Sequence, residues 1–262
     1  MSLKTQPDSG VRPGQLDLPP GFAGIALREL GDAMSHAVGV AAARGAGTLV
    51  WVRRFDTVEF AVVLEPEEPL ACARRALYAA MNAAADALAA IVPPEKPITF
   101  DWPDTILLDG GIIGGGRLLW PDVAPEDTVP EWLVAGFVLR SIVPLAKGGS
   151  LPGAHPLDER LERGTSLASE GIEMLDGAAL VSSFARHLMV QVDQWQAAGF
   201  AQVGRDYLAR LMPVPGVSRA VDTNGDLLTR RVSNPNDSQR RPLLAALAIP
   251  RWLDPETHEP WL

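Results

Sequence analysis

Three consecutive glycines, Gly114 to Gly116, lie in a stretch of sequence that should otherwise favour β-branched residues. The surrounding residues 98–120 form three apolar runs, which break at Trp102-Pro103-Asp104 and again at Asp109-Gly110-Gly111. This pattern predicts a strand, a hairpin and a returning strand. Glycine weakens a strand, and it occurs there at a bulge or where a ligand or another backbone approaches closely. The glycines therefore predict either a bulged hairpin or the floor of a ligand site.

The carboxylates of the same stretch do not form a convincing catalytic pair. Asp101 and Asp104 are three residues apart across a proline, and a turn explains Asp109. The four histidines lack the spacing of a metal site, so no metal held by protein groups is predicted. Cys72, the single cysteine, lies in an apolar helical stretch and is predicted to be a buried, inert thiol in a reducing compartment.

Two well-known catalytic motifs are also absent from the sequence. Neither Gly-x-Ser-x-Gly nor Gly-x-x-x-x-Gly-Lys-Ser occurs, which argues against a serine hydrolase and a P-loop enzyme. The glycine triplet is not followed by a predicted helix, so it does not match a dinucleotide-binding fingerprint.

Helices and strands must position the glycine-rich hairpin, and apolar periodicity predicts them along the chain. We expect helices at 33–44 with Asp32 as N-cap, 70–92, 165–171, 180–195 and 203–211, and strands at 24–30, 48–55, 57–65, 131–145, 217–221 and 227–232. The continuously apolar run 131–145 is typical of a central strand covered on both faces. Residues 147–164 are expected to form a loop.

These elements are interleaved without strict alternation, which predicts the α+β fold class. We divide the chain into a disordered leader at 1–20, a main domain at 21–212 and a small all-β C-terminal module at 213–262. A turn signal at 222–226 supports a hairpin in that module.

Composition limits the partners that the protein can have. A net charge of -9 and a pI near 5.0 argue against nucleic acid, because binding to phosphate backbones depends on clustered Lys and Arg. Residues 1–20 lack the apolar core of a secretory signal, and charged residues interrupt the most apolar helical stretch, 71–92. The expected location is the cytoplasm, without a membrane partner.

The hairpin resembles a known family. Trp102-Pro103-Asp104, the short apolar strand, the turn and the glycine-rich return strand look like the Trp-Pro-Asn-Asp hairpin of biotin protein ligases and the related lipoate ligases. The order of predicted elements is similar over residues 24–212, and Thr165-Ser166-Leu167 followed by Gly171 resembles the helix after the family's central strand. The resemblance implies a mixed sheet packed by helices, with a small barrel-like module at 216–260.

This family resemblance also implies a ligand site and reveals departures from the family pattern. Trp102, Pro103, Asp104 and Gly114 to Gly116 would shape the acyl pocket, and Arg140 is a further candidate for ligand binding. The family's glycine- and arginine-rich loop is replaced here by Arg53-Arg54-Phe55. Its two lysines are replaced by Asp101 and Ile112. A cation stabilises charge that develops on phosphate, so Arg53, Arg54 and Arg117 are the candidate catalytic cations.

Three hypotheses for function follow. The first is a diverged relative that binds a small carboxylic acid, such as biotin or lipoate, without ligating it. The second is an active ligase that uses ATP and Mg²⁺ to form an acyl-adenylate, with arginines in place of the lysines. That enzyme would transfer the acyl group to a lysine of a biotinyl or lipoyl carrier domain. The third is a non-catalytic regulatory or structural module.

Overall fold

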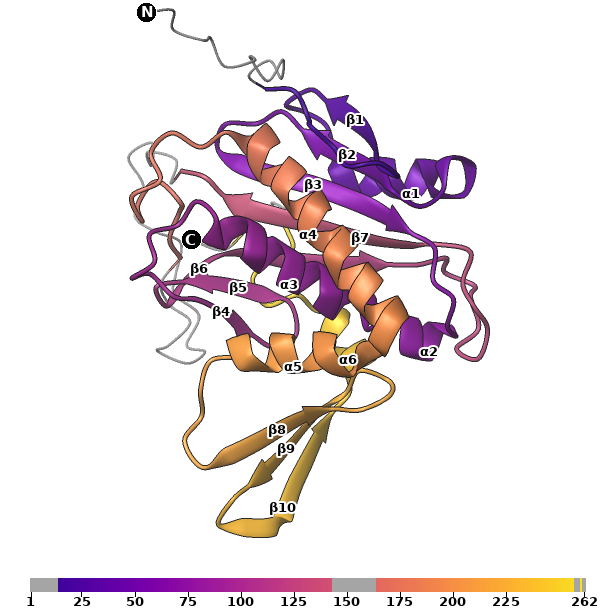
Figure 1. Cartoon of the computed structure of the whole chain (residues 1–262), viewed down its shortest axis with the longest axis vertical. Helices are drawn as coiled ribbons and strands as arrows, with labels where there is room; N and C mark the ends of the chain where they lie inside the picture. Colours follow the sequence, from indigo (N-terminus) through magenta and orange to yellow (C-terminus); the bar gives the residue numbers. More distant parts are fainter. Residues whose placement is uncertain (1–13, 143–163, 257–259, 261–262) are drawn as a thin grey trace, which may run out of the picture.

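A mixed seven-stranded sheet forms the main body of the computed structural model, which describes residues 14–142, 164–256 and 260 (Figure 1). The strand order is β1-β2-β3-β7-β6-β5-β4. The strands are β1 (Ala23–Leu27), β2 (Thr48–Val52), β3 (Thr57–Leu64), β4 (Ile98–Asp101), β5 (Thr105–Leu108), β6 (Gly111–Leu119) and β7 (Leu133–Arg140). Only β1 and β2 pair in parallel, and β7 lies at the centre, which confirms the prediction for the apolar run.

Helices cover the two faces of this sheet unequally (Figure 1). Helices α3 (Ala76–Ala89), α4 (Gly177–Ala198) and α5 (Phe200–Arg210) together pack the larger core on what we call the α3/α4 face. Helix α1 (Ala33–Arg44) packs a smaller core against β2, β3 and β7 on the opposite face, the α1 face. Over β5 and β6, the α1 face is covered by residues near the C-terminus.

The glycine-rich hairpin has the predicted strand, turn and return strand. Asp109 and Gly110 have φ angles of 50° and 83°, as a tight turn between β5 and β6 requires. The pairing register then shifts between Ile106 and Leu107, which marks a bulge in the ladder. The bulged hairpin is therefore confirmed, and the three glycines lie inside the return strand β6, as predicted.

Two predicted helices differ in the structure. The run 70–92 is divided into α2 (Leu70–Ala73) and α3 at Arg74 and Arg75, where backbone N–H groups bond to carbonyls three residues back instead of four. The buried Arg74 side chain is held by Glu126 and stacks over Trp120. The run 165–171 forms hydrogen-bonded turns instead of a helix. The predicted loop 147–164 lies outside the described residues, apart from residue 164.

The N-terminal stretch that is described contacts the main body. The Asp17 N–H donates to Ser182 Oγ of α4 at 2.9 Å, and Leu16 and Leu18 pack against the larger core. Residues 1–13 of the predicted leader lie outside the described residues. No helix in the described part of the chain is long and apolar enough to cross a bilayer.

A second sheet follows α5 and projects from the main body (Figure 1). It is antiparallel, in the order β10-β9-β8, and consists of β8 (Val217–Val221), β9 (Leu227–Arg231) and β10 (Asn234–Arg241). Strands β8 and β9 were predicted. Strand β10 and the short helix α6 (Leu243–Leu247), which leads the chain back toward the large sheet, were not.

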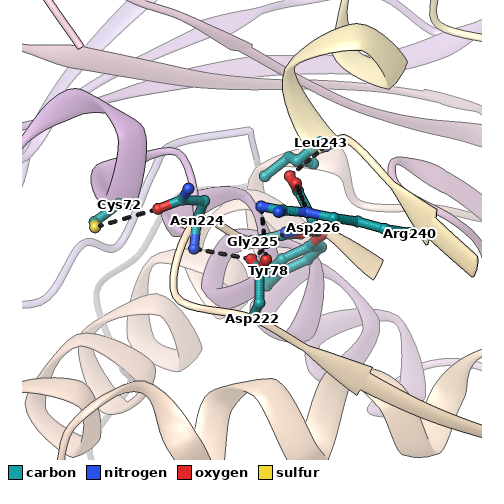
Figure 2. Close-up of polar contacts among 8 residues, drawn as sticks. All are labelled: Cys72, Tyr78, Asp222, Asn224, Gly225, Asp226, Arg240 and Leu243. Carbon is teal, nitrogen blue, oxygen red and sulfur yellow. Dashed lines mark hydrogen bonds and ion pairs between the residues drawn. The ribbon is translucent and has the colours of Figure 1, made fainter. Parts of the chain in front are cut away.

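The turn between β8 and β9 fixes the start of this return (Figure 2). The Asp222 carboxylate accepts the backbone N–H groups of Asn224 and Asp226, each at 2.9 Å. Arg240 of β10 bonds to Asp222 at 2.9 Å and to Asp226 at 2.7 Å. Asp226 also accepts the Leu243 N–H at 2.8 Å, so one turn orients both β10 and α6.

Tyr78 of α3 contacts this turn (Figure 2) and connects it to the hairpin. Its hydroxyl donates to the Gly225 carbonyl at 2.5 Å and accepts the indole N–H of Trp102 at 2.9 Å. Tyr78 is fully buried, and burial raises the pKa of its hydroxyl well above the usual range. The hydroxyl therefore satisfies two polar groups that water does not reach.

Tyr78→Phe is expected to lower the free energy of unfolding by about 2–4 kcal/mol, because both the Trp102 N–H and the Gly225 carbonyl lose a buried partner. Urea unfolding measures this change. Tyr207→Phe is the matched control, since the fully buried Tyr207 hydroxyl serves one acceptor, the Pro103 carbonyl at 2.8 Å. An equal or larger loss in the control would contradict the two-partner role of Tyr78.

Candidate functional site

The three glycines of β6 meet different surroundings. A Cβ on Gly116 would lie 3.0 Å from Phe137 and 3.1 Å from Met81 of the α3/α4 core. Gly114 has φ of +144°, and a Cβ there would lie 1.9 Å from the carbonyl oxygen of Val138 on β7. Strand pairing at Gly114 and core packing at Gly116 therefore leave little room for a side chain.

Gly115 is the glycine that faces the other way, and a tryptophan covers it. A Cβ on Gly115 would lie 2.5 Å from Nε1 of Trp252 and 2.3 Å from the carbonyl oxygen of Asp104. The Trp252 side chain is fully buried. Trp252, which is near the C-terminus in sequence, thus lies directly on Gly115, one of the three glycines predicted to form a ligand floor.

Further contacts hold this C-terminal segment, residues 250–256 and 260, on the sheet. Arg251 bonds to Asp101 of β4 at 3.5 Å, and Leu253 packs in a small cluster with Ile112 of β6. The buried Arg140 guanidinium at the end of β7 donates to the Pro260 carbonyl. Arg140, a predicted ligand-binding residue, therefore binds the chain's own C-terminal segment.

A cavity of about 210 Å³ lies beside Trp252, between the C-terminal segment and the start of α1. Its lining includes Arg54, Glu59, Arg117, Gly136, Val138 and Trp252. It lies against the central strand β7 and its two neighbours, β3 and β6. Of the three candidate arginines, two therefore share one cavity.

The candidate arginines have different environments. Arg117 is half-buried and has no hydrogen bond or ion pair with any residue that the structure describes. Arg54 pairs with Asp56 at 2.6 Å, and this hydrogen bond holds the pKa of the Asp56 carboxyl below its usual range. Arg53 is exposed, lies 5.9 Å from the centre of the Trp51 ring and does not line the cavity. Arg117 is thus the cation best able to receive an anion.

Two carboxylates also line the cavity, and α1 engages both. Asp32 caps the helix by accepting the Ser35 N–H at 2.7 Å, as predicted for an N-cap. Glu59 of β3 accepts the Ala33 N–H at 2.6 Å. The first-turn N–H groups of α1 thus offset part of the negative charge beside Arg117.

The three hairpin residues predicted to shape the pocket, Trp102, Pro103 and Asp104, do not line this cavity. Trp102 packs into the α3/α4 core, and the Pro103 carbonyl accepts a hydrogen bond from the Tyr207 hydroxyl. Asp104 is 2% exposed, and burial raises the pKa of its carboxyl to about 7. The Trp252 indole N–H approaches this carboxyl without a hydrogen bond of normal geometry.

Asp104→Asn is expected to flatten part of the pH dependence of stability. The pKa of Asp104 is about 7 in the folded protein against an ordinary value of 3.8, so the folded state binds a proton that the unfolded chain releases. The stability from this group is fully present below 3.8 and is lost as the pH rises to about 7. The loss is at most about 1.4 kcal/mol per pH unit.

Urea unfolding of the wild type and Asp104→Asn between pH 4 and pH 8 tests this expectation. The free energy of unfolding of the variant should rise relative to that of the wild type as the pH increases. Parallel profiles for the two proteins would contradict a raised pKa at Asp104.

Sequence reasoning missed the main contributors from outside the hairpin. Trp252 lies in a Pro-Arg-Trp-Leu-Asp-Pro stretch with no periodicity that indicates a return to the large sheet. Side chains alternate between the two covered faces of β3, which predicts the face of Glu59 but not its partner. Within the described ranges, no group of three or more His, Cys, Asp or Glu residues is arranged to hold a metal ion.

Comparisons with known proteins agree with this architecture. A family model described as the biotin/lipoate A/B protein ligase family matches residues 18–209. A biotin protein ligase-like protein of unknown function from Silicibacter sp. TM1040 is similar in structure, with a TM-score of 0.73 and 24% identity, over 88% of this chain and 98% of that one. No curated protein matches the chain.

More distant similarity extends to enzymes. Biotin protein ligase from Aquifex aeolicus has a TM-score of 0.59 and 12% identity, over 84% of this chain and 95% of that one. The structure of the same enzyme in complex with biotin and ATP has a TM-score of 0.58 and 12% identity, over 83% and 94%. These likenesses show a shared fold.

Proposed function

The chain belongs to the biotin/lipoate A/B protein ligase family, and from this premise we propose that it binds a small carboxylic acid in the cavity beside Arg117. The observation that carries the proposal is the position of Arg117. Its half-buried side chain lines the cavity and has no partner among the described residues. A guanidinium matches a carboxylate through paired, charge-assisted hydrogen bonds.

The rest of the cavity suits an acid with a polar end and an apolar end. Val138 and Trp252 supply apolar surface next to Gly115. Ligand sites commonly combine such surface with a few polar groups that fix orientation. The carboxylate would lie at Arg117 and the acyl part would lie toward Trp252.

Binding without ligation is the function that these residues favour. A solved relative is described in complex with biotin and ATP, and in the ligase alternative a carrier-domain lysine would accept the acyl group. In this chain, Asp101 precedes Trp102 and pairs with Arg251 at 3.5 Å, and Ile112 is 5% exposed under the C-terminal segment. A carboxylate and a covered isoleucine do not fit the phosphates of ATP. We therefore derive no adenylation step.

Arg117→Gln is expected to weaken acid binding roughly ten- to hundredfold, because a charge-assisted hydrogen bond contributes about 1.5–3 kcal/mol. Isothermal titration calorimetry with acetate, butyrate, hexanoate, octanoate, biotin and lipoate measures the affinities. Arg53→Gln is the matched control, since Arg53 is exposed and lies outside the cavity. Its affinities should equal those of the wild type.

Two results would change this assignment. Absence of binding with every acid would contradict the proposal. Pyrophosphate release that requires both ATP and one of the acids would establish the ligase alternative in its place.

A further inference from the structure

We propose that Trp252 sets the length of the acid that this site accepts, so that the site takes short-chain carboxylic acids and rejects acids as large as biotin, lipoate or octanoate. The inference rests on the proposed function and narrows its ligand class. It makes Trp252 a specificity-determining residue.

The position of the indole supports this role. Trp252 is fully buried, and its Nε1 lies 2.5 Å from where a Cβ on residue 115 would be, so only glycine at that position admits the ring. The same side chain forms one wall of the cavity. The surface over Gly115 that an extended acyl chain would use is therefore already occupied.

The space between Arg117 and Trp252 is short. Arg117 and Gly115 are two residues apart on the same face of β6, which places their backbones roughly 7 Å apart. An acid bound through its carboxylate at Arg117 meets the indole when it extends in this direction. The cavity volume of about 210 Å³ is also below the roughly 300–1,000 Å³ of sites for drug-sized ligands.

The wall is fixed from several sides. Leu253, the next residue, packs on Ile112, and Arg251, the preceding one, bonds to Asp101 at 3.5 Å. Farther along the segment, Arg140 holds the Pro260 carbonyl. A longer acid would have to displace a fully buried tryptophan together with these contacts.

The test compares wild type, Trp252→Ala and Leu253→Ala by calorimetry with butyrate, hexanoate, octanoate, biotin and lipoate. We expect the wild type to prefer butyrate and hexanoate. Trp252→Ala should gain at least tenfold in affinity for octanoate or biotin and keep its affinity for butyrate. Leu253 helps to hold this wall but does not line the cavity, so Leu253→Ala should gain clearly less affinity for octanoate or biotin than Trp252→Ala.

Wild-type protein that binds biotin or octanoate as tightly as butyrate would overturn the inference. An equal gain for longer acids in Leu253→Ala would also overturn it, since general loosening would then explain the change. Binding of acids with a length preference that Trp252→Ala leaves unchanged overturns this inference alone. If none of the acids binds to any of the three proteins, the proposed function is contradicted as well.

Circular dichroism shows whether each variant folds. If Trp252→Ala does not fold, Trp252→Leu keeps an apolar side chain and opens part of the same space. The expected gain for octanoate then applies to Trp252→Leu, and its absence overturns the inference.

Discussion

The buried hydroxyl of Tyr78 joins the three parts on which the site depends. It accepts the Trp102 N–H at the start of the hairpin and donates to Gly225 in the C-terminal module, while its own backbone belongs to α3. A buried polar group without a partner is costly, so the three parts are fixed relative to one another. This contact, together with Leu227 and Leu243 in the larger core, holds the module and thus the chain that follows it.

The chain that follows the module completes the α1 face. The turn that contains Gly225 orients Leu243 through Asp226, and the chain then returns to place Trp252 on Gly115. The α3/α4 face, by contrast, is filled by helices from the middle of the chain. The glycine-rich hairpin and the C-terminal segment thus pack together on the α1 face. The cavity lies between that segment and the start of α1.

Charge gives this cavity its chemical character. The carboxylates of Asp32 and Glu59 are engaged by the first turn of α1, and Arg54 is engaged by Asp56. Arg117 has no such partner among the described residues. A protein of net negative charge therefore presents a half-buried cation beside apolar surface.

The sequence by itself determined the local features: the Asp32 cap, the tight turn at Asp109-Gly110, the hairpin and the central apolar strand, with the bulge as one of two alternatives. These depend on neighbouring residues and on the period of the strand, which a sequence displays directly. Only the tertiary structure decided which glycine faces the site and that Trp252 covers it. It also decided that Arg54 and Arg117 share a cavity from which Arg53 is absent. These facts depend on contacts between residues far apart in the chain, and no local pattern encodes such contacts.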